Sequence, residues 1–175
     1  MDYLPFEEVR QTSEFAEYHR AAEAFCEFLE GNSKLATADF LAMVRSHLLR
    51  LYTAALAMPW MDLQSNEEFE ERLSADAFQA VLHSVAEQLG AARYYWHVFN
   101  PVNDRDTEPV CSDLLDDVGD IYKDLKYSLM ILGLGKGECE ENALWQLKFD
   151  FDAHWSRHCV NALSAIHFYL ANFKI

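Results

Sequence analysis

The amino-acid sequence predicts an all-α fold, a single-domain up-and-down bundle of about five helices over residues 1–175. Apolar residues recur at spacings of three and four positions, which is the period of helices with one buried face. The 6 glycines and 4 prolines are few and stand mostly between these periodic segments. Because 51% of the residues are hydrophobic, a chain of this length buries a sizeable core without disulfides or a structural metal.

Capping and breaking residues delimit the first three helices. One is predicted over residues 12–30, where a Gly-Asn pair follows it. A second begins at Thr37, a good N-cap residue, and ends before Pro59. A third begins at Ser74. The acidic segment 59–73 is predicted to be a loop with at most a short helical turn.

An aromatic segment follows the third helix. Its rings belong to Tyr94, Tyr95, Trp96 and Phe99, and a polar linker over residues 100–111 comes next. Such rings either line a binding cleft or close one end of a bundle. Because stacking platforms usually carry basic residues, which are sparse here, we expect them to plug the end of the bundle.

The fourth helix is predicted over residues 112–132, with Ser112 as its N-cap. Opposite its apolar face runs an aspartate stripe, namely Asp113, Asp117, Asp120 and Asp124. Each like-charge contact in the stripe is unfavourable by ~0.2–0.5 kcal/mol. Basic side chains of a neighbouring helix, a divalent cation or simple solvation could offset this repulsion.

The fifth helix is predicted over residues 139–172. Its apolar side carries Leu144, Trp145, Phe149, Phe151, Trp155, Cys159, Leu163, Ile166 and Leu170. Another side carries His154 and His158, one above the other. Two histidines four residues apart on a helix can bind one zinc-like ion, whereas ordinary hydrogen bonding within the fold is the alternative.

A glycine-rich turn at 133–137 joins the last two helices, so we expect them to pack antiparallel. At ~1.5 Å of rise per residue, the histidines and the start of the aspartate stripe then lie at the same level. We predict that Arg157 or a histidine approaches Asp113, Asp117 or Asp120. The candidate metal ligands are therefore Asp113, Asp117, Asp120, Asp124, His154 and His158.

Charge limits the kinds of partner. With 14 basic and 29 acidic residues, the formal net charge is -15, which repels nucleic-acid phosphates and anionic lipid headgroups. We therefore expect no nucleic-acid partner and no membrane partner. The N-terminus lacks a secretory pattern, and the apolar runs fall short of the ~20 residues that span a bilayer, which favours a cytoplasmic location. The 4 scattered cysteines form no CxxC pair and are expected to be reduced.

The C-terminal half resembles a known family. The runs YYWHVFNP at 94–101, DLLDDVGDIYKDLK at 113–126, FDFDAHW at 149–155 and NALSAIH at 161–167 are similar to an uncharacterised bacterial family, domain-of-unknown-function family 5063. This resemblance implies an all-helical fold. The family has no established activity, so the resemblance implies none for this chain.

Two acidic runs carry a second, local resemblance. The run DDVGDI at 116–121 resembles the EELGDL signature of the all-helical, MazG-like nucleoside triphosphate pyrophosphohydrolases, and EEFEE at 67–71 resembles their EExxE motif. In those enzymes, carboxylates on neighbouring helices hold Mg²⁺, which bridges phosphate oxygens and activates water. The resemblance implies a similar role for Asp117 and Asp120.

The sequence contains no phosphate-binding loop, no nucleophile and base pair, and no strong metal motif. We therefore expect a non-enzymatic interaction or accessory protein with an acidic surface, a protein partner and no cofactor. The abundant aromatic residues are compatible with homo-oligomerisation. The alternative is a Mg-dependent pyrophosphohydrolase-like enzyme that uses the aspartate stripe, with Mg²⁺ or another divalent cation as cofactor.

Overall fold

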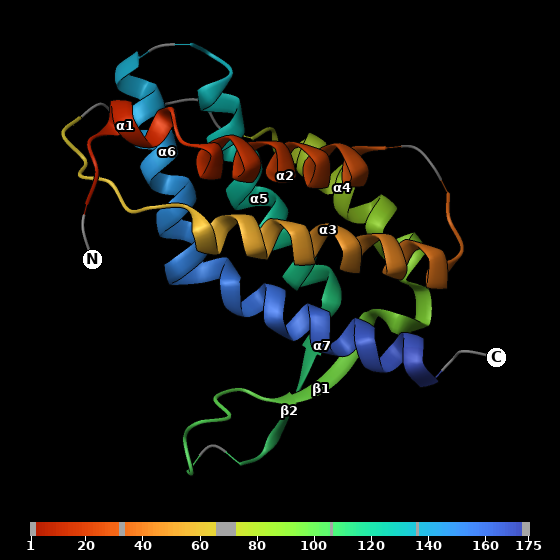
Figure 1. Cartoon of the computed structure of the whole chain (residues 1–175). Helices are drawn as coiled ribbons and strands as arrows, with labels where there is room; N and C mark the ends of the chain where they lie inside the picture. Colours follow the sequence, from red (N-terminus) through yellow and green to blue (C-terminus); the bar gives the residue numbers. More distant parts are fainter. Residues whose placement is uncertain (1–2, 32–33, 66–72, 106, 136, 173–175) are drawn as a thin grey trace.

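A computed structural model of the chain describes residues 3–31, 34–65, 73–105, 107–135 and 137–172. Within these residues, the helices pack around a shared hydrophobic core, and a β-hairpin projects from the bundle (Figure 1). This confirms the predicted all-α bundle. The elements are α1 (Phe6–Arg10), α2 (Ser13–Glu30), α3 (Thr37–Ala57), α4 (Ala75–Leu89), β1 (Tyr94–Val98), β2 (Pro109–Asp113), α5 (Leu114–Leu132), α6 (Gly137–Asp150) and α7 (Ser156–Asn172).

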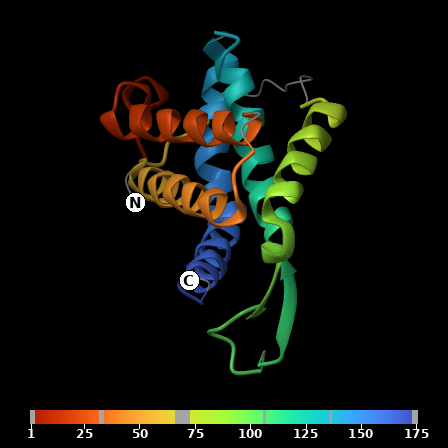
Figure 2. The ribbon, with the colours of Figure 1, turned by 90° about the vertical axis from the view of Figure 1, so that its right-hand side faces the viewer.

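Helix α5 is the central element of the bundle. It contacts α2, α4, α6 and α7. Figure 2 shows α5 and α6 between α4 on one side and the α2–α3 pair on the other. The apolar face predicted for this helix accounts for the packing, since Leu114, Val118, Ile121 and Leu125 are all buried. None of the helices in the described part of the chain is long and apolar enough to cross a membrane.

Local capping differs from the prediction at two helices. Helix α3 begins at Thr37, but its N-cap is Ala36, and no side chain caps it. Helix α5 is capped by Asp113, whose Oδ1 accepts a hydrogen bond from the Leu115 amide at 2.9 Å. Ser112 is not the cap because it is the β2 residue that pairs with Tyr95 of β1. Because Ser112 is paired in the strand, α5 begins at Leu114 and not at residue 112 as predicted.

The predicted fifth helix is a continuous helical segment with one irregular turn. A π-helical turn at Phe151–Trp155 joins α6 to α7. The segment runs back along α5, so that α6 and α7 both contact it, as expected for antiparallel neighbours. Phe149, predicted to be buried, is 40% exposed, whereas Leu147 is buried. At about 100° per residue, Phe149 lies about 140° around the helix from the buried Leu144, whereas Leu147 lies only about 60° from it.

The β-hairpin is an element that the sequence analysis did not predict, as are helix α1 and the π-helical turn. Strands β1 and β2 pair antiparallel, and the predicted linker contributes β2. The hairpin projects from the end of the bundle at which α5 begins (Figure 1). The prediction that the aromatic rings plug the bundle is therefore wrong, since Tyr94, Trp96 and Phe99 are 61%, 70% and 65% exposed. Alternation along the strand turns Tyr95 inward.

Gly119 allows α4 to lie close against α5. A Cβ at this position would lie 2.7 Å from Cδ2 of Leu82, which is too close for any real contact. A single methyl group could push the leucine tip aside, but a branched side chain needs more room. The glycine therefore leaves room on α5 for the Leu82 side chain of α4.

We predict that Gly119→Val lowers the free energy of unfolding by about 2 kcal/mol, because overpacking separates α4 from α5. Lys123→Val is the matched control, because Lys123 is exposed on the same helix. This substitution should cost only the lower helix propensity of valine, about 0.5 kcal/mol. Urea denaturation followed by circular dichroism measures both. Equal losses in the two variants would contradict the close approach.

Candidate functional site

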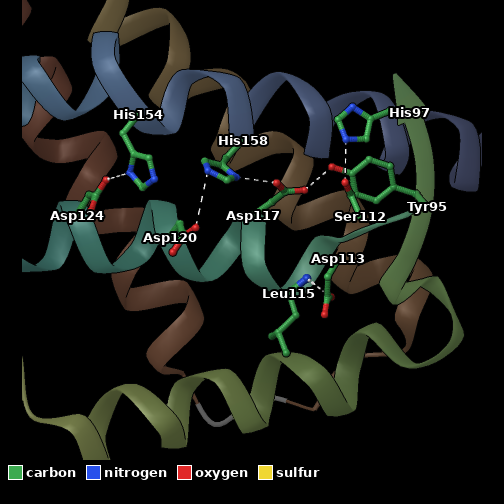
Figure 3. A network of polar contacts seen from close by, with 10 residues as sticks. All are labelled: Tyr95, His97, Ser112, Asp113, Leu115, Asp117, Asp120, Asp124, His154 and His158. Carbon is green, nitrogen blue, oxygen red and sulfur yellow. Dashed lines mark hydrogen bonds and ion pairs between the residues drawn. The ribbon is translucent and has the colours of Figure 1, made fainter. Parts of the chain in front are cut away.

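Acidic side chains of α5 face two histidines, His154 of the π-helical turn and His158 of α7, along the groove where the packed helices meet (Figure 3). His158 Nδ1 lies 2.8 Å from Asp117 Oδ1, and His158 Nε2 lies 3.7 Å from Asp120 Oδ2. The predicted approach of a histidine to the aspartate stripe is thus confirmed. His158 and Asp117 are 41 residues apart, so the antiparallel packing of the two helices brings them together.

His154 makes a second pair one turn away. Its Nδ1 lies 2.6 Å from Asp124 Oδ2. His154 belongs to the π-helical turn, and its ring meets the His158 ring edge-on, with centroids 5.0 Å apart and an interplanar angle of 73°. The two imidazoles therefore face the same stretch of α5 and each uses Nδ1 for a carboxylate.

Asp117 is the buried member of the stripe, only 5% exposed. Burying a carboxylate is costly unless hydrogen bonds replace its water. Oδ1 of Asp117 accepts from His158, and Oδ2 accepts from the Tyr95 hydroxyl at 2.6 Å. Burial, together with the hydrogen bond to Asp117, raises the pKa of Tyr95, so its hydroxyl keeps the proton that it donates. The hydrogen bond to Asp117 also raises the pKa of His158.

The groove contains a group of three side chains that could hold a metal ion. One ligand atom each from Asp120, His154 and His158 lie within 4.8 Å of one another. When Nδ1 of a neutral imidazole donates to a carboxylate, the free electron pair lies on Nε2. Both histidines place Nδ1 beside a carboxylate, so the neutral form of each ring can donate from Nδ1 and offer Nε2 to an ion. All three side chains are partly exposed.

The other predicted candidates lie around this group. Asp117 and Asp124 bind the Nδ1 atoms of the two histidines. Asp113 is turned away, because it caps α5 and forms an ion pair with Arg93, whose Nε lies 2.8 Å from Asp113 Oδ2. The structure thus separates the six candidates into three potential ligands, two hydrogen-bonding partners and one helix cap.

Sequence reasoning missed Tyr95 and Arg93 as parts of the site. Both reach the aspartate stripe from the segment that leads into and forms β1. The available signal for Tyr95 was the run of aromatic and β-branched residues at 94–99, because such residues are enriched in strands. His97 and Ser112 extend the polar network, with His97 Nε2 2.7 Å from Ser112 Oγ.

Asp150 lies near the other end of the groove. It accepts a hydrogen bond from Gln146 at 2.6 Å. Together with Lys123, Asp124 and Tyr127, these residues line a cavity of about 440 Å³. Burial raises the pKa of Asp150 to about 6, and the charge of Asp124 adds to this effect. Ionisation of this carboxyl group near neutral pH therefore lowers the free energy of unfolding.

The fold and the groove define an all-helical protein with facing acidic and imidazole side chains on two antiparallel helices. Residues 9–172 match the model of a family described as a domain of unknown function, DUF5063, and the chain belongs to that family. This confirms the resemblance seen in the C-terminal half of the sequence. The match extends it to the N-terminal helices.

A solved structure shares this fold. The crystal structure of protein BF1032 from Bacteroides fragilis has a TM-score of 0.79 and 22% sequence identity to this chain, over 92% of this chain and 94% of that one. At this identity, the likeness shows the fold alone. No curated protein matched the chain. None of these comparisons supports the local resemblance to MazG-like enzymes.

We predict that Asp150→Asn raises stability at pH 7 by about 1–2 kcal/mol, allowing for partial solvent screening. The pKa of about 6 in the folded state lies above the ordinary aspartate value of 3.8, so the folded state binds the proton more tightly than the unfolded chain does. Stability contributed by this carboxyl group therefore falls as pH rises from about 4 to about 6.

Urea denaturation at pH 4 and pH 7 checks this expectation. The gain from Asp150→Asn should be largest at pH 7 and should nearly vanish at pH 4. Asp104→Asn, which removes the same charge from an exposed loop position, is the control for the overall negative charge. A gain of the same size at both pH values would contradict the assigned shift.

Proposed function

We propose that the protein binds a divalent transition-metal ion in the groove between α5 and α7. The ligands are Nε2 of His154, Nε2 of His158 and a carboxylate oxygen of Asp120. One ligand atom from each of these residues lies within 4.8 Å of the others, which supports the proposal. The three residues come from α5, the π-helical turn and α7, whose packing around the core holds them at a defined separation.

The observation that carries the proposal is the pairing of both Nδ1 atoms with carboxylates. His158 is held by Asp117 at 2.8 Å and His154 by Asp124 at 2.6 Å. Histidines that bind metals almost always donate their other ring N–H to a carboxylate, a carbonyl group or water. This partner fixes the ring orientation and raises the basicity of the ligand nitrogen. The same arrangement occurs twice in this groove.

The ligand types indicate the class of ion. Two imidazoles and one carboxylate suit Fe²⁺, Mn²⁺, Co²⁺, Ni²⁺ or Zn²⁺ and leave coordination positions open. An ion with open positions can bind and activate water or polarise an oxygen of a bound molecule. Mg²⁺ and Ca²⁺ prefer oxygen ligands alone. The proposed centre is therefore a transition-metal site.

The expected alternative, Mg-dependent pyrophosphohydrolysis, gains no support from the described residues. Asp113 and Asp117 of the stripe are held by Arg93, Tyr95 and His158. The acidic run at 67–71 that carried half of the resemblance lies outside the described residues. We therefore do not propose that reaction.

The β-hairpin favours a second role, as an accessory protein that binds a protein partner. Tyr94, Trp96 and Phe99 are all more than 60% exposed on one projecting element. Exposed clusters of large aromatic side chains mark interaction surfaces, and Trp and Tyr are common at their energetic centres. This role is compatible with metal binding, because the hairpin surface and the proposed ligands are different residues.

We predict that the purified protein binds one Zn²⁺ or Co²⁺ per chain. His158→Gln and Asp120→Asn should each weaken binding by about 100-fold or more, beyond the 10–100-fold typical of an outer-shell partner. His167→Gln, on the exposed side of the same helix, should leave affinity unchanged. Calorimetry and Co²⁺ absorption spectra measure these affinities. If folded protein binds none of Mn²⁺, Fe²⁺, Co²⁺, Ni²⁺ or Zn²⁺ at micromolar concentration, the metal centre is refuted.

The hairpin role makes a separate prediction. A specific protein should co-purify reproducibly from native lysate, and Trp96→Ala should weaken its purified complex by about 30-fold, the loss typical of a binding hot spot. Leu56→Ala is the control, because Leu56 is 62% exposed on α3, away from the hairpin. Equal affinities of the Trp96→Ala and wild-type proteins for that partner would contradict this surface.

A further inference from the structure

Two hydrogen bonds in series link the β-hairpin to the proposed metal centre. The Tyr95 hydroxyl of β1 donates to Asp117 Oδ2 at 2.6 Å, and Asp117 Oδ1 accepts from His158 Nδ1 at 2.8 Å. Figure 3 shows these three side chains in one line, from the strand across α5 to α7. The two oxygens of one carboxylate thus bind donors from two different elements.

The position of Tyr95 in the strand makes this contact specific. Tyr95 pairs with Ser112 in the ladder and points toward the bundle, whereas its neighbours Tyr94 and Trp96 point outward and are exposed. A shift of the hairpin that moves the outer rings therefore also moves the Tyr95 hydroxyl. The exposed surface and the inward contact share one short strand, Tyr94–Val98.

The bridging carboxylate has little freedom to adapt. Asp117 is 5% exposed, so water cannot readily replace a lost donor. Without the Tyr95 hydroxyl, one oxygen of Asp117 would lack this hydrogen bond, and rotation of the carboxylate would alter its bond to His158. The orientation of the imidazole, and with it the direction of Nε2, depends on this bond.

We propose that Tyr95 is a positioning residue that couples the β-hairpin to metal binding, through Asp117 and His158. This inference rests on the proposed metal centre and adds its regulation. An ion on His158 Nε2 holds the ring, the ring holds Asp117, and Asp117 holds Tyr95, so the hairpin becomes more rigid. Because coupling between two binding events is reciprocal, a partner that rigidifies the hairpin also strengthens metal binding.

Tyr95→Phe tests the coupling, because it removes only the hydroxyl group. We expect it to weaken Zn²⁺ binding by about tenfold, the lower end of the range for outer-shell partners. Tyr94→Phe is the matched control, since it removes a neighbouring hydroxyl that points outward, and we expect its affinity to stay within about twofold of wild type. Competition with a chromophoric chelator measures the Kd of the full chain.

Hydrogen exchange of the hairpin amides supplies a readout that a loss of folding cannot imitate. Zn²⁺ should slow exchange over β1 and β2 in the wild-type protein and in Tyr94→Phe, but not in Tyr95→Phe. If Tyr95→Phe fails to fold, the wild-type comparison with and without Zn²⁺ decides the question alone.

The possible failures differ from one another. Absence of Zn²⁺ binding to the wild-type protein overturns the metal centre and the coupling together. Binding of Zn²⁺ at the groove with no change in exchange over β1 and β2, or with equal Kd values for Tyr95→Phe and wild type, overturns the coupling and leaves the metal centre standing.

Discussion

The buried carboxylate of Asp117 is the point at which three elements of this structure meet. It belongs to α5, and it accepts hydrogen bonds from Tyr95 of β1 and His158 of α7. An ionised carboxylate that lost these donors would stay buried at a cost of several kcal/mol. The attachment of the hairpin and the orientation of the α7 histidine are therefore parts of one arrangement, because each stabilises the charge on which the other depends.

The four aspartates of the stripe have different surroundings, and this difference explains how α5 tolerates them. Asp113 is paired with Arg93, Asp117 is buried between two donors, and Asp124 is paired with His154. Neighbouring elements thus supply the groups that offset like-charge repulsion at these positions. Among the described residues, Asp120 has only a longer ion-pair contact, 3.7 Å to His158. It is the stripe residue best placed to take a cation as its counter-charge.

Local sequence patterns predicted the helices and the level at which α5 meets α7, because helical period and a short glycine turn are properties of adjacent residues. They predicted that Arg157 or a histidine approaches Asp113, Asp117 or Asp120, and His158 meets Asp117 at 2.8 Å. Tyr95 could not be found in this way, because its contact depends on a strand whose partner lies beyond a loop. The same missing strand pairing explains why Trp96 was expected to plug the end of the bundle and Ser112 to cap the helix.

The π-helical turn at Phe151–Trp155 accommodates one residue more than a regular α-helix would hold between α6 and α7. Deletion of one residue from this turn would therefore restore a regular α-helix and leave α7 close to its present orientation, with Cys159 and Ile166 still in the core. The change would fall on the turn itself, where His154 stands opposite Asp124. A single in-frame codon loss would thus displace one histidine of the pair and leave His158 beside Asp117.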